Sequence, residues 1–372
     1  MKKLLTGILA LSLAASMSIP AFAAENTAKN DGTAGTNITV NGKFQAGASS
    51  GDIISVDLVW DDMSFTYTAP SKGTWNATEH KYENATEGGW VWDNATETKT
   101  APVITVTNHS NIAVKTAFVF NGAVKGLNGN FSKASFVLPT AVGTEFDNAP
   151  TAETEFSVDG TAIDADRQIG TITVTVADTS AVLTVEELRA TADQTGVFKL
   201  GCNIDLGTSP LVITSSNYTL DLNGFTLSGS IDRESVVFAS ANSNVTVKNG
   251  TVNNICTEYG WAVHGRSATL VLENCELISY SSGLFSENGT AMIKDCNIKT
   301  ILIGHYNVTN YNGSALTISG NIIFEDGAGL SNQFEANTTA LPGTYNFDVS
   351  SYVDTALYDV TNDGTTWTVT AK

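Results

Sequence analysis

The fold is decided by a short pattern that first appears as Leu220-Asp-Leu222-Asn-Gly224-Phe-Thr-Leu227. The pattern is apolar, any, apolar, any, then Asn, Asp or Gly, then two variable positions and a final apolar residue. Four further copies follow, at residues 245–252, 270–277, 291–298 and 316–323. Their starting points are separated by 25, 25, 21 and 25 residues, a period typical of solenoids whose stacked repeats share one core.

Each copy predicts one coil of a parallel solenoid. Apolar residues on both sides of a polar bend indicate two strands, and the fifth position favours residues that tolerate a left-handed backbone or bond the backbone. A third apolar stretch recurs in most coils, at residues 236–238, 261–263, 284–285 and 301–303. We therefore expect three strands per coil, with inward side chains stacked on one another. The outward positions of the five copies are Asp221, Thr246, Val271, Met292 and Thr317.

A different pattern precedes the repeats, between residues 37 and 178. Short stretches alternate at period two between turn residues, as in Ile54–Trp60 and Ile172–Val176, and this pattern predicts a β-sandwich domain. Trp60 falls in phase with Val56 and Leu58, so we expect its ring in the core. The chain as a whole is rich in Thr, Val, Asn and Gly, and this composition also favours strands and tight turns.

Residues 184–194 contain the one convincing helix. Thr184 and Glu187 have the spacing of a capping box, and Val185 with Leu188 marks an apolar face. Because a stack of coils leaves open ends, we expect this helix to cap the N-terminal end of a β-helix that spans residues 181–330. Residues 331–372 predict a strand-rich cap at the C-terminal end.

The repeats also carry a family resemblance. The stretch from Val197 to Gly327, through the copies at 220–227 and 245–252, resembles the pectate-lyase-like right-handed parallel β-helix superfamily, and most closely its secreted, adhesin-type members in gut Firmicutes. The resemblance implies an all-β chain in which an N-terminal β-sandwich precedes a right-handed parallel β-helix with a capping helix. It implies no single activity, since the superfamily includes lyases, hydrolases and proteins without a known reaction.

The first 23 residues have the features of a signal peptide. Lys2 and Lys3 precede an apolar stretch, and Ala21-Phe22-Ala23 has the small-x-small form of a cleavage site. The stretch is too short and too mixed to serve as a membrane anchor. Residues 24–36 are polar and small and predict a flexible linker. We expect an extracellular protein, secreted or held non-covalently at a bacterial cell surface, without membrane insertion.

The net negative charge of the chain limits the kinds of molecule that it is expected to bind. The chain has 19 Lys and Arg against 38 Asp and Glu, and removing Lys2 and Lys3 leaves 17 against 38, a formal charge of −21. So negative a surface repels nucleic acid phosphates and anionic lipids. The leading hypothesis is a non-catalytic surface or matrix protein that binds glycans or neighbouring proteins. The alternative is a polysaccharide lyase or glycoside hydrolase, although the outward positions supply one acid in five and no catalytic residue is assigned.

Two groups of residues are candidates for glycan binding. Trp90 and Trp92, with Tyr82 nearby, would offer rings on which sugars stack, or else they fill the core of the sandwich. His264 and Arg266 lie in a segment that resembles a turn of the enzymatic β-helices but lacks its first glycine. They would form a sugar-binding turn with Glu258 and Tyr259, or else a solvated loop.

Metal and cysteine chemistry give weaker signals. The acidic segments Asp61–Asp62 and Asp159–Asp166 could hold calcium or be ordinary turns, and the four scattered histidines predict no zinc site. No cofactor is assigned. Cys275 and Cys296 occupy the sixth position of consecutive copies, so stacking brings them about 4.8 Å apart, within disulfide range. Export permits oxidation, whereas an anaerobic habitat would leave two stacked thiols.

Overall fold

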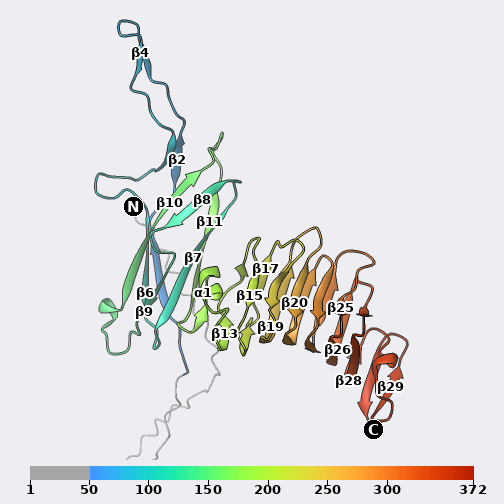
Figure 1. The fold of residues 1–372 in the computed structure, drawn as a ribbon. Coiled ribbons are helices and arrows are strands. Elements are labelled where there is room, and N and C mark those ends of the chain that lie inside the picture. Colours follow the sequence, from blue (N-terminus) through green and yellow to red (C-terminus); the bar gives the residue numbers. More distant parts are fainter. Residues whose placement is uncertain (1–50) are drawn as a thin grey trace, which may run out of the picture.

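The computed structural model describes residues 51–372 (Figure 1). The expected signal peptide (1–23), the linker (24–36) and the start of the first domain (37–50) lie outside these residues. The described chain is mostly β-structure: antiparallel sheets come first, parallel coils follow one another, and an antiparallel hairpin ends the chain (Figure 1). Within the described range, no helix has the length and apolar character needed to cross a bilayer.

The N-terminal part consists mainly of two antiparallel sheets, of order β1-β6-β10-β8 and β11-β7-β9. Their strands are β1 (Val56–Trp60), β6 (Val103–Asn108), β7 (Val114–Gly122), β8 (Leu127–Phe131), β9 (Ser135–Leu138), β10 (Thr151–Gly160) and β11 (Gly170–Asp178). Every second side chain of β6 is buried, as the period-two pattern predicts. One apolar cluster joins residues of both sheets, including Val106 on β6 and Phe118 on β7.

A long hairpin extension leaves the first sheet between β1 and β6 and projects away from the rest of the molecule (Figure 1). Its base is the pair β2 (Phe65–Thr68) and β5 (Gly89–Trp92), and its tip is the pair β3 (Thr74–Asn76) and β4 (Lys81–Glu83). Four tryptophans that lie close together in the sequence are therefore separated in space. Trp60 lies on β1, Trp90 and Trp92 lie at the base of the extension, and Trp75 lies at its tip.

The expected core position of Trp60 is wrong. Val56 and Leu58 pack against the apolar cluster, but the Trp60 side chain is 52 % exposed. Trp60 is the last residue of β1, which is an edge strand of its sheet. The alternation that turns Val56 and Leu58 inward therefore continues to Trp60, but the apolar cluster does not extend far enough to cover its ring.

Parallel pairing begins directly after β11, where β12 (Ala181–Val182) pairs with β13 (Gly196–Leu200). Between them lies α1 (Val185–Ala190), whose N-cap is Thr184. The Thr184 side chain accepts a hydrogen bond from Glu187 N (3.2 Å), as the capping box predicts. The Glu187 carboxylate accepts in turn from Leu183 N (2.9 Å) and from Lys115 Nζ on β7 (3.0 Å), so one side chain ties the helix to the antiparallel part.

The helix is shorter than the predicted range 184–194. After Ala190 the chain continues in tight turns, with hydrogen bonds from Thr191 N to Leu188 O and from Gln194 N to Thr191 O. The Thr191 hydroxyl also bonds Leu188 O and the Tyr218 hydroxyl, each at 2.7 Å. These side-chain bonds compete with the helical pattern and end it. Leu188 is fully buried in the core of the coils.

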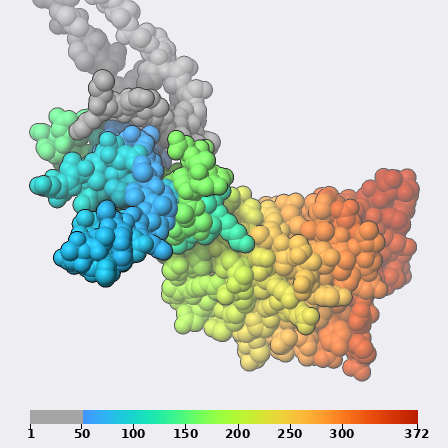
Figure 2. All heavy atoms as spheres, turned by 90° about the horizontal axis from the view of Figure 1, so that it is seen from above, coloured from blue at the N-terminus to red at the C-terminus, as the bar shows by residue number. Residues whose placement is uncertain are grey.

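Residues 196–345 form a β-solenoid of about six turns. Figure 2 shows the coils as one continuous body from green to red. The strands of its large sheet are β14 (Ile204–Asp205), β16 (Tyr218–Asp221), β17 (Thr226–Gly229), β19 (Asn244–Asn254), β21 (Thr269–Ser279), β23 (Thr290–Lys294), β24 (Asn297–Thr300), β26 (Ala315–Glu325) and β28 (Asn337–Tyr345). The six-stranded sheet contains β15 (Leu211–Ile213), β18 (Ser235–Ala239), β20 (Trp261–Arg266), β22 (Ser282–Glu287), β25 (Val308–Tyr311) and β27 (Leu330–Gln333).

The stacking of inward side chains is confirmed. The third residues of the second to fifth copies pair in register from coil to coil, and each is fully buried: Val247, Leu272, Ile293 and Ile318. In the first copy the first residue, Leu220, pairs with Val247 and is also fully buried, so the strand before that bend is shifted by two residues against the pattern. The fifth residues all have positive φ, at Gly224 (84°), Asn249 (60°), Asn274 (53°), Asp295 (53°) and Gly320 (70°). The preference for Asn, Asp and Gly at this bend therefore follows from its left-handed backbone.

The structure corrects two details of the repeat. In the fifth copy Ile322 is buried in place of the expected Ile323, and the β26–β28 register shifts between Ile318 and Gly320. The expected strand at 301–303 is a loop in which Ile303 is 91 % exposed, because β25 takes the strand position beside β22.

The coils continue past the expected limit at residue 330. β28 still pairs in parallel with β26, and the chain then closes with an antiparallel hairpin of β29 (Tyr358–Asn362) and β30 (Trp367–Ala371). β30 pairs with β28, so the hairpin extends the large sheet at its C-terminal end. Val369 on β30 belongs to the same apolar core as the coils.

Candidate functional site

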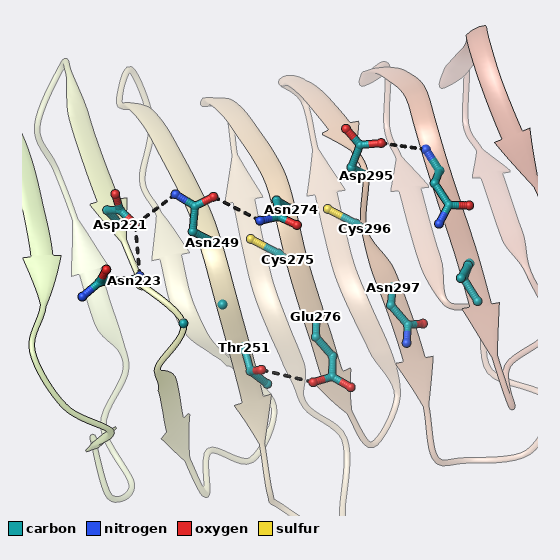
Figure 3. A pocket seen from close by; sticks show the side chains of 14 residues that line it. Asp221, Asn223, Asn249, Thr251, Asn274, Cys275, Glu276, Asp295, Cys296 and Asn297 are labelled. Carbon is teal, nitrogen blue, oxygen red and sulfur yellow. Dashed lines mark hydrogen bonds between the residues drawn. The ribbon is translucent and has the colours of Figure 1, made fainter. Parts of the chain in front are cut away.

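An open groove of about 640 Å³ follows the polar bends of successive coils (Figure 3). Its upper rim is a row of amide and carboxylate side chains, one from each coil. Asn249 Nδ2 donates to Asp221 Oδ1 (3.1 Å), and Asn274 Nδ2 donates to Asn249 Oδ1 (3.2 Å). Asp295 Oδ1 accepts from the backbone N–H of Asn321 (2.8 Å). This row links neighbouring coils and steadies their left-handed bends.

The lower rim of the same groove is also internally bonded. Thr251 Oγ1 donates to Glu276 Oε2 (3.1 Å), and Asn297 Nδ2 donates to Glu325 Oε1 (2.8 Å). A ligand in the groove would therefore compete with existing hydrogen bonds on both rims. We assign the groove a structural role and look for a ligand site elsewhere.

A second hollow, of about 370 Å³, opens beside the six-stranded sheet, and we call it the aromatic pocket. Three successive coils supply its rings, from the turn and strand at 259–261, from β22 and from the loop before β25, and a fourth coil adds Gln333 on β27. Its rings belong to Tyr259, Trp261, Phe285, His305 and Tyr306, and its polar side chains are Ser281, Ser282, Thr309 and Gln333. Tyr259 is 54 % exposed and Tyr306 is 38 % exposed, so both keep ring surface accessible at the mouth.

The rings of the pocket have distinct packing roles. Trp261 and Phe285 stack on each other, with centroids 4.7 Å apart and an interplanar angle of 24°, and form a fixed wall. Tyr259 and His305 lie 5.5 Å apart at 57°, which leaves the faces of these rings only partly covered. The pocket thus combines a rigid aromatic wall with two exposed tyrosines and with hydroxyl and amide groups.

His264 lies beside this pocket, but neither of its expected environments is correct. It belongs to β20 rather than to a turn or a solvated loop, and it is fully buried. Its ring packs against Phe238 (4.9 Å), Trp261 (5.2 Å) and Phe285 (5.0 Å) on the outward row of the six-stranded sheet. A side chain without exposed surface cannot contact a sugar, so His264 supports the wall of the pocket.

Two carboxylates flank the buried imidazole. His264 Nδ1 lies 3.1 Å from Glu234 Oε1, and His264 Nε2 lies 3.8 Å from Glu287 Oε2. Burial raises the pKa of the Glu234 carboxyl, but the hydrogen bond and charge of His264 outweigh this effect and hold that pKa below its usual value. Arg266 ends β20 on the surface, where its Nε donates to Glu287 Oε2 (2.9 Å).

The proposed glycan platform of Trp90 and Trp92 is not an open surface. Trp92 is 6 % exposed and its Nε1 donates to Asp62 O (2.7 Å), so the expectation of an exposed ring is wrong for this residue. Trp90 is half-buried and packs on Tyr67 at 5.4 Å. Both rings lie on β5 at the base of the extension, where they cover apolar surface. The alternative of core packing therefore describes Trp92.

Tyr82 is separated from these two tryptophans. It lies on β4 at the tip of the extension, is 54 % exposed, and packs edge-on against Trp75 at 5.2 Å. His80 stacks on the same Trp75 ring, with centroids 6.3 Å apart. The structure therefore divides the expected aromatic cluster into a packed base and an exposed tip.

The acidic candidates for calcium bind protein groups. An Asp61 carboxylate oxygen accepts from Val103 N (2.8 Å), and Asp159 accepts from Asn128 and Asn130. From residue 51 onward, no group of three or more His, Cys, Asp or Glu side chains is arranged to hold a metal ion. Cys275 and Cys296 lie next to each other, and both thiols are buried and free. The other two cysteines are also free: Cys256 is buried and Cys202 is half-buried.

Of the residues that line the aromatic pocket, the sequence pattern identified only Tyr259; the predicted His264 and Arg266 lie beside the pocket and do not line it. Trp261 and Phe285 appear in the third apolar stretch of two coils, where they were assigned only to strands. His305 and Tyr306 belong to a loop that carries no repeat signal. Comparison of the chain with protein-family models, curated proteins and solved structures finds no match.

Proposed function

We propose that this chain is an exported, non-catalytic surface or matrix protein that binds a glycan at the aromatic pocket. The observation that carries the proposal is the composition of the pocket, in which exposed tyrosine rings surround hydroxyl and amide side chains. Sugars present apolar C–H faces and hydroxyl groups, so this combination matches both halves of their chemistry. No Asp, Glu, Lys or Arg lines the pocket, which favours a neutral sugar unit.

The rest of the architecture suits display of such a site. We infer that the solenoid is right-handed, as the resemblance implies, and that α1 caps its N-terminal end through Leu188, which packs into the core. The two antiparallel sheets are proposed to form a β-sandwich around their shared apolar cluster. Stacked coils hold the three pocket segments at fixed spacing, so little ordering would be needed on binding.

A glycan array followed by calorimetry on the best neutral glycan tests the proposal. Tyr259→Ala removes an exposed ring of the pocket without opening the core, and we expect binding to weaken about 3- to 10-fold, the effect of losing about 0.5–1.5 kcal/mol of aromatic contact. Trp60→Ala is the matched control, because this equally exposed ring lies on the antiparallel part. Equal weakening by both variants, or no glycan binding, would reject the proposal.

A second candidate function rests on the carboxylates beside His264. Glu234 and Glu287 are each only partly buried and flank the imidazole from two neighbouring coils. A hydrolase or lyase needs acidic groups gathered at one sugar, and these two carboxylates lie beside a histidine that packs on the wall of the pocket. Release of reducing sugars or unsaturated products from a polysaccharide, abolished by Glu287→Gln, would establish this alternative in place of the binding role.

A further inference from the structure

Cys275 and Cys296 lie side by side in consecutive coils, beneath the groove of polar bends (Figure 3). The two side chains are 4 % and 2 % exposed, and both thiols are free. Both residues belong to the apolar core cluster of the solenoid. Their sulfur atoms point the same way from neighbouring coils, as Figure 3 shows.

Strand pairing on both sides of the cysteines fixes their relative position. Glu273 pairs with Lys294 before them, and Glu276 pairs with Asn297 after them. Strands in one sheet are about 4.8 Å apart, and a disulfide usually joins Cα atoms separated by about 4.4–6.8 Å. A disulfide between these two residues therefore requires rotation of side chains rather than movement of a coil.

We propose that Cys275 and Cys296 are a modification site at which a small disulfide oxidant, of the glutathione disulfide class, closes a covalent link between two neighbouring coils. This property is independent of glycan binding. A disulfide is neutral, so its formation places no charge in the apolar core. The surrounding structure thus favours this product over an ionised thiol.

The thiol–disulfide exchange proceeds in two balanced steps. The Cys296 thiolate attacks one sulfur of the oxidant, forms a mixed disulfide and expels the other half as a thiolate. Cys275 then transfers its proton to the expelled thiolate and attacks the Cys296 sulfur, which releases the second half of the oxidant as a thiolate that takes up the proton lost by Cys296 to the solvent. Two protein thiols are oxidised to one disulfide, and one oxidant disulfide is reduced to two thiols.

The direction of each thiol's pKa favours these roles. The hydrogen bond between them lowers the pKa of Cys296, against the effect of burial, whereas the same bond and burial raise the pKa of Cys275. Cys296 is therefore the thiol that ionises more readily and attacks first. Its low exposure means that attack needs local opening of the bend, so the folded protein should react more slowly than the unfolded chain.

The remaining cysteines provide an internal control. Cys202 donates to Leu183 O (3.2 Å) near α1, and Cys256 donates to Glu258 O (3.6 Å) in the turn before β20. Neither lies in a strand of the solenoid, and neither is bonded to another cysteine. Oxidation limited to the stacked pair would consume two of the four thiols of the chain.

The test uses the purified full chain, reduced and then refolded with oxidised glutathione. We expect thiol titration under denaturing conditions to fall from four to two, and peptide mass spectrometry to place the link between Cys275 and Cys296. The linked protein should melt roughly 5–10 °C higher than the reduced protein. Cys275→Ser and Cys296→Ser should each abolish this shift, whereas the double variant Cys202→Ser with Cys256→Ser should keep it.

Three results would overturn the proposal: four titratable thiols after oxidation, a link that involves Cys202 or Cys256, or a mixed glutathione adduct that never resolves. Circular dichroism of the reduced serine variants checks that they fold. If Cys275→Ser does not fold, the double variant still decides the matter, since it retains the stacked pair alone.

Discussion

Ile293→Asp is the most informative single change in the solenoid. Ile293 is fully buried on β23 and pairs in register with Leu272 in the coil before it and Ile318 in the coil after it. An aspartate at this position would place a carboxyl group between two layers of aliphatic side chains. Every neighbouring coil would be affected, because each coil buries its apolar face only against the next one.

The expected magnitude follows from two contributions. Loss of a buried isoleucine removes about 1.5–3 kcal/mol of transfer free energy. Burial of a polar group without a hydrogen-bond partner costs at least about 1–3 kcal/mol more, even if the carboxyl group is protonated. We therefore expect the free energy of unfolding to fall by about 4 kcal/mol, at the upper end of single-residue effects.

Urea unfolding followed by circular dichroism measures this change. With a slope of about 2 kcal/mol/M, a loss of 4 kcal/mol moves the midpoint by about 2 M. Met292→Asp is the matched control, because Met292 is the adjacent residue on the same strand and is 40 % exposed on the opposite face. We expect this control to change the free energy of unfolding by no more than about 0.5 kcal/mol.

Equal destabilisation by the two aspartates would refute the inside–outside register of the coils. A larger effect at Met292 would place the core on the other face of β23.

Three further predictions concern polar groups of the coils. Burial raises the pKa of Tyr218 to about 12, although its hydrogen bond with Thr191 opposes this rise, so stability should fall as pH increases from about 10 to 12. Tyr218→Phe should reduce this alkaline loss in urea midpoints measured at pH 9 and 11.5, and the remainder belongs to groups such as Tyr345, whose pKa burial also raises. The pKa of Glu234 lies below its usual value, so its stabilising contribution is complete above about pH 4.5 and is lost as pH falls through the folded-state value. Glu234→Gln should flatten the decline in melting temperature between pH 6 and 3, and an unchanged decline would contradict the ion pair with His264. Asn249→Ala should reduce the free energy of unfolding by about 2 kcal/mol because of its φ of 60° and its two ladder bonds, whereas Asn249→Gly should restore the conformational part of that loss.

The repeat pattern predicted the parts of the structure that depend on local chemistry. Buried Leu220 and Ile293, and the left-handed bends at Asn249 and Asp295, follow directly from periodicity and from the backbone preferences of Asn and Asp. The capping box at Thr184 was predictable for the same reason, since its bonds span only four residues. Patterns of this kind predict features that depend on residues close together in the sequence.

Features that depend on the packing of distant segments were not predictable in this way. Trp60 continues an inward pattern, but the extent of the opposing apolar cluster decides whether its ring is covered. His264 has a turn-like sequence around it, yet it is buried because rings from two neighbouring coils lie on it. The aromatic pocket combines Tyr259, Phe285 and Tyr306, which only the stacking of three coils brings together.

Hydrogen exchange read by mass spectrometry, with and without a bound neutral glycan, tests the central claim most directly. Glycan binding at the aromatic pocket predicts slower exchange in peptides that contain residues 259–261, 281–285 and 304–309, the three segments that carry its rings. Peptides from the extension at 65–92 should be unchanged. Protection confined to that extension or to the groove of polar bends, with none in the three pocket segments, would contradict the account.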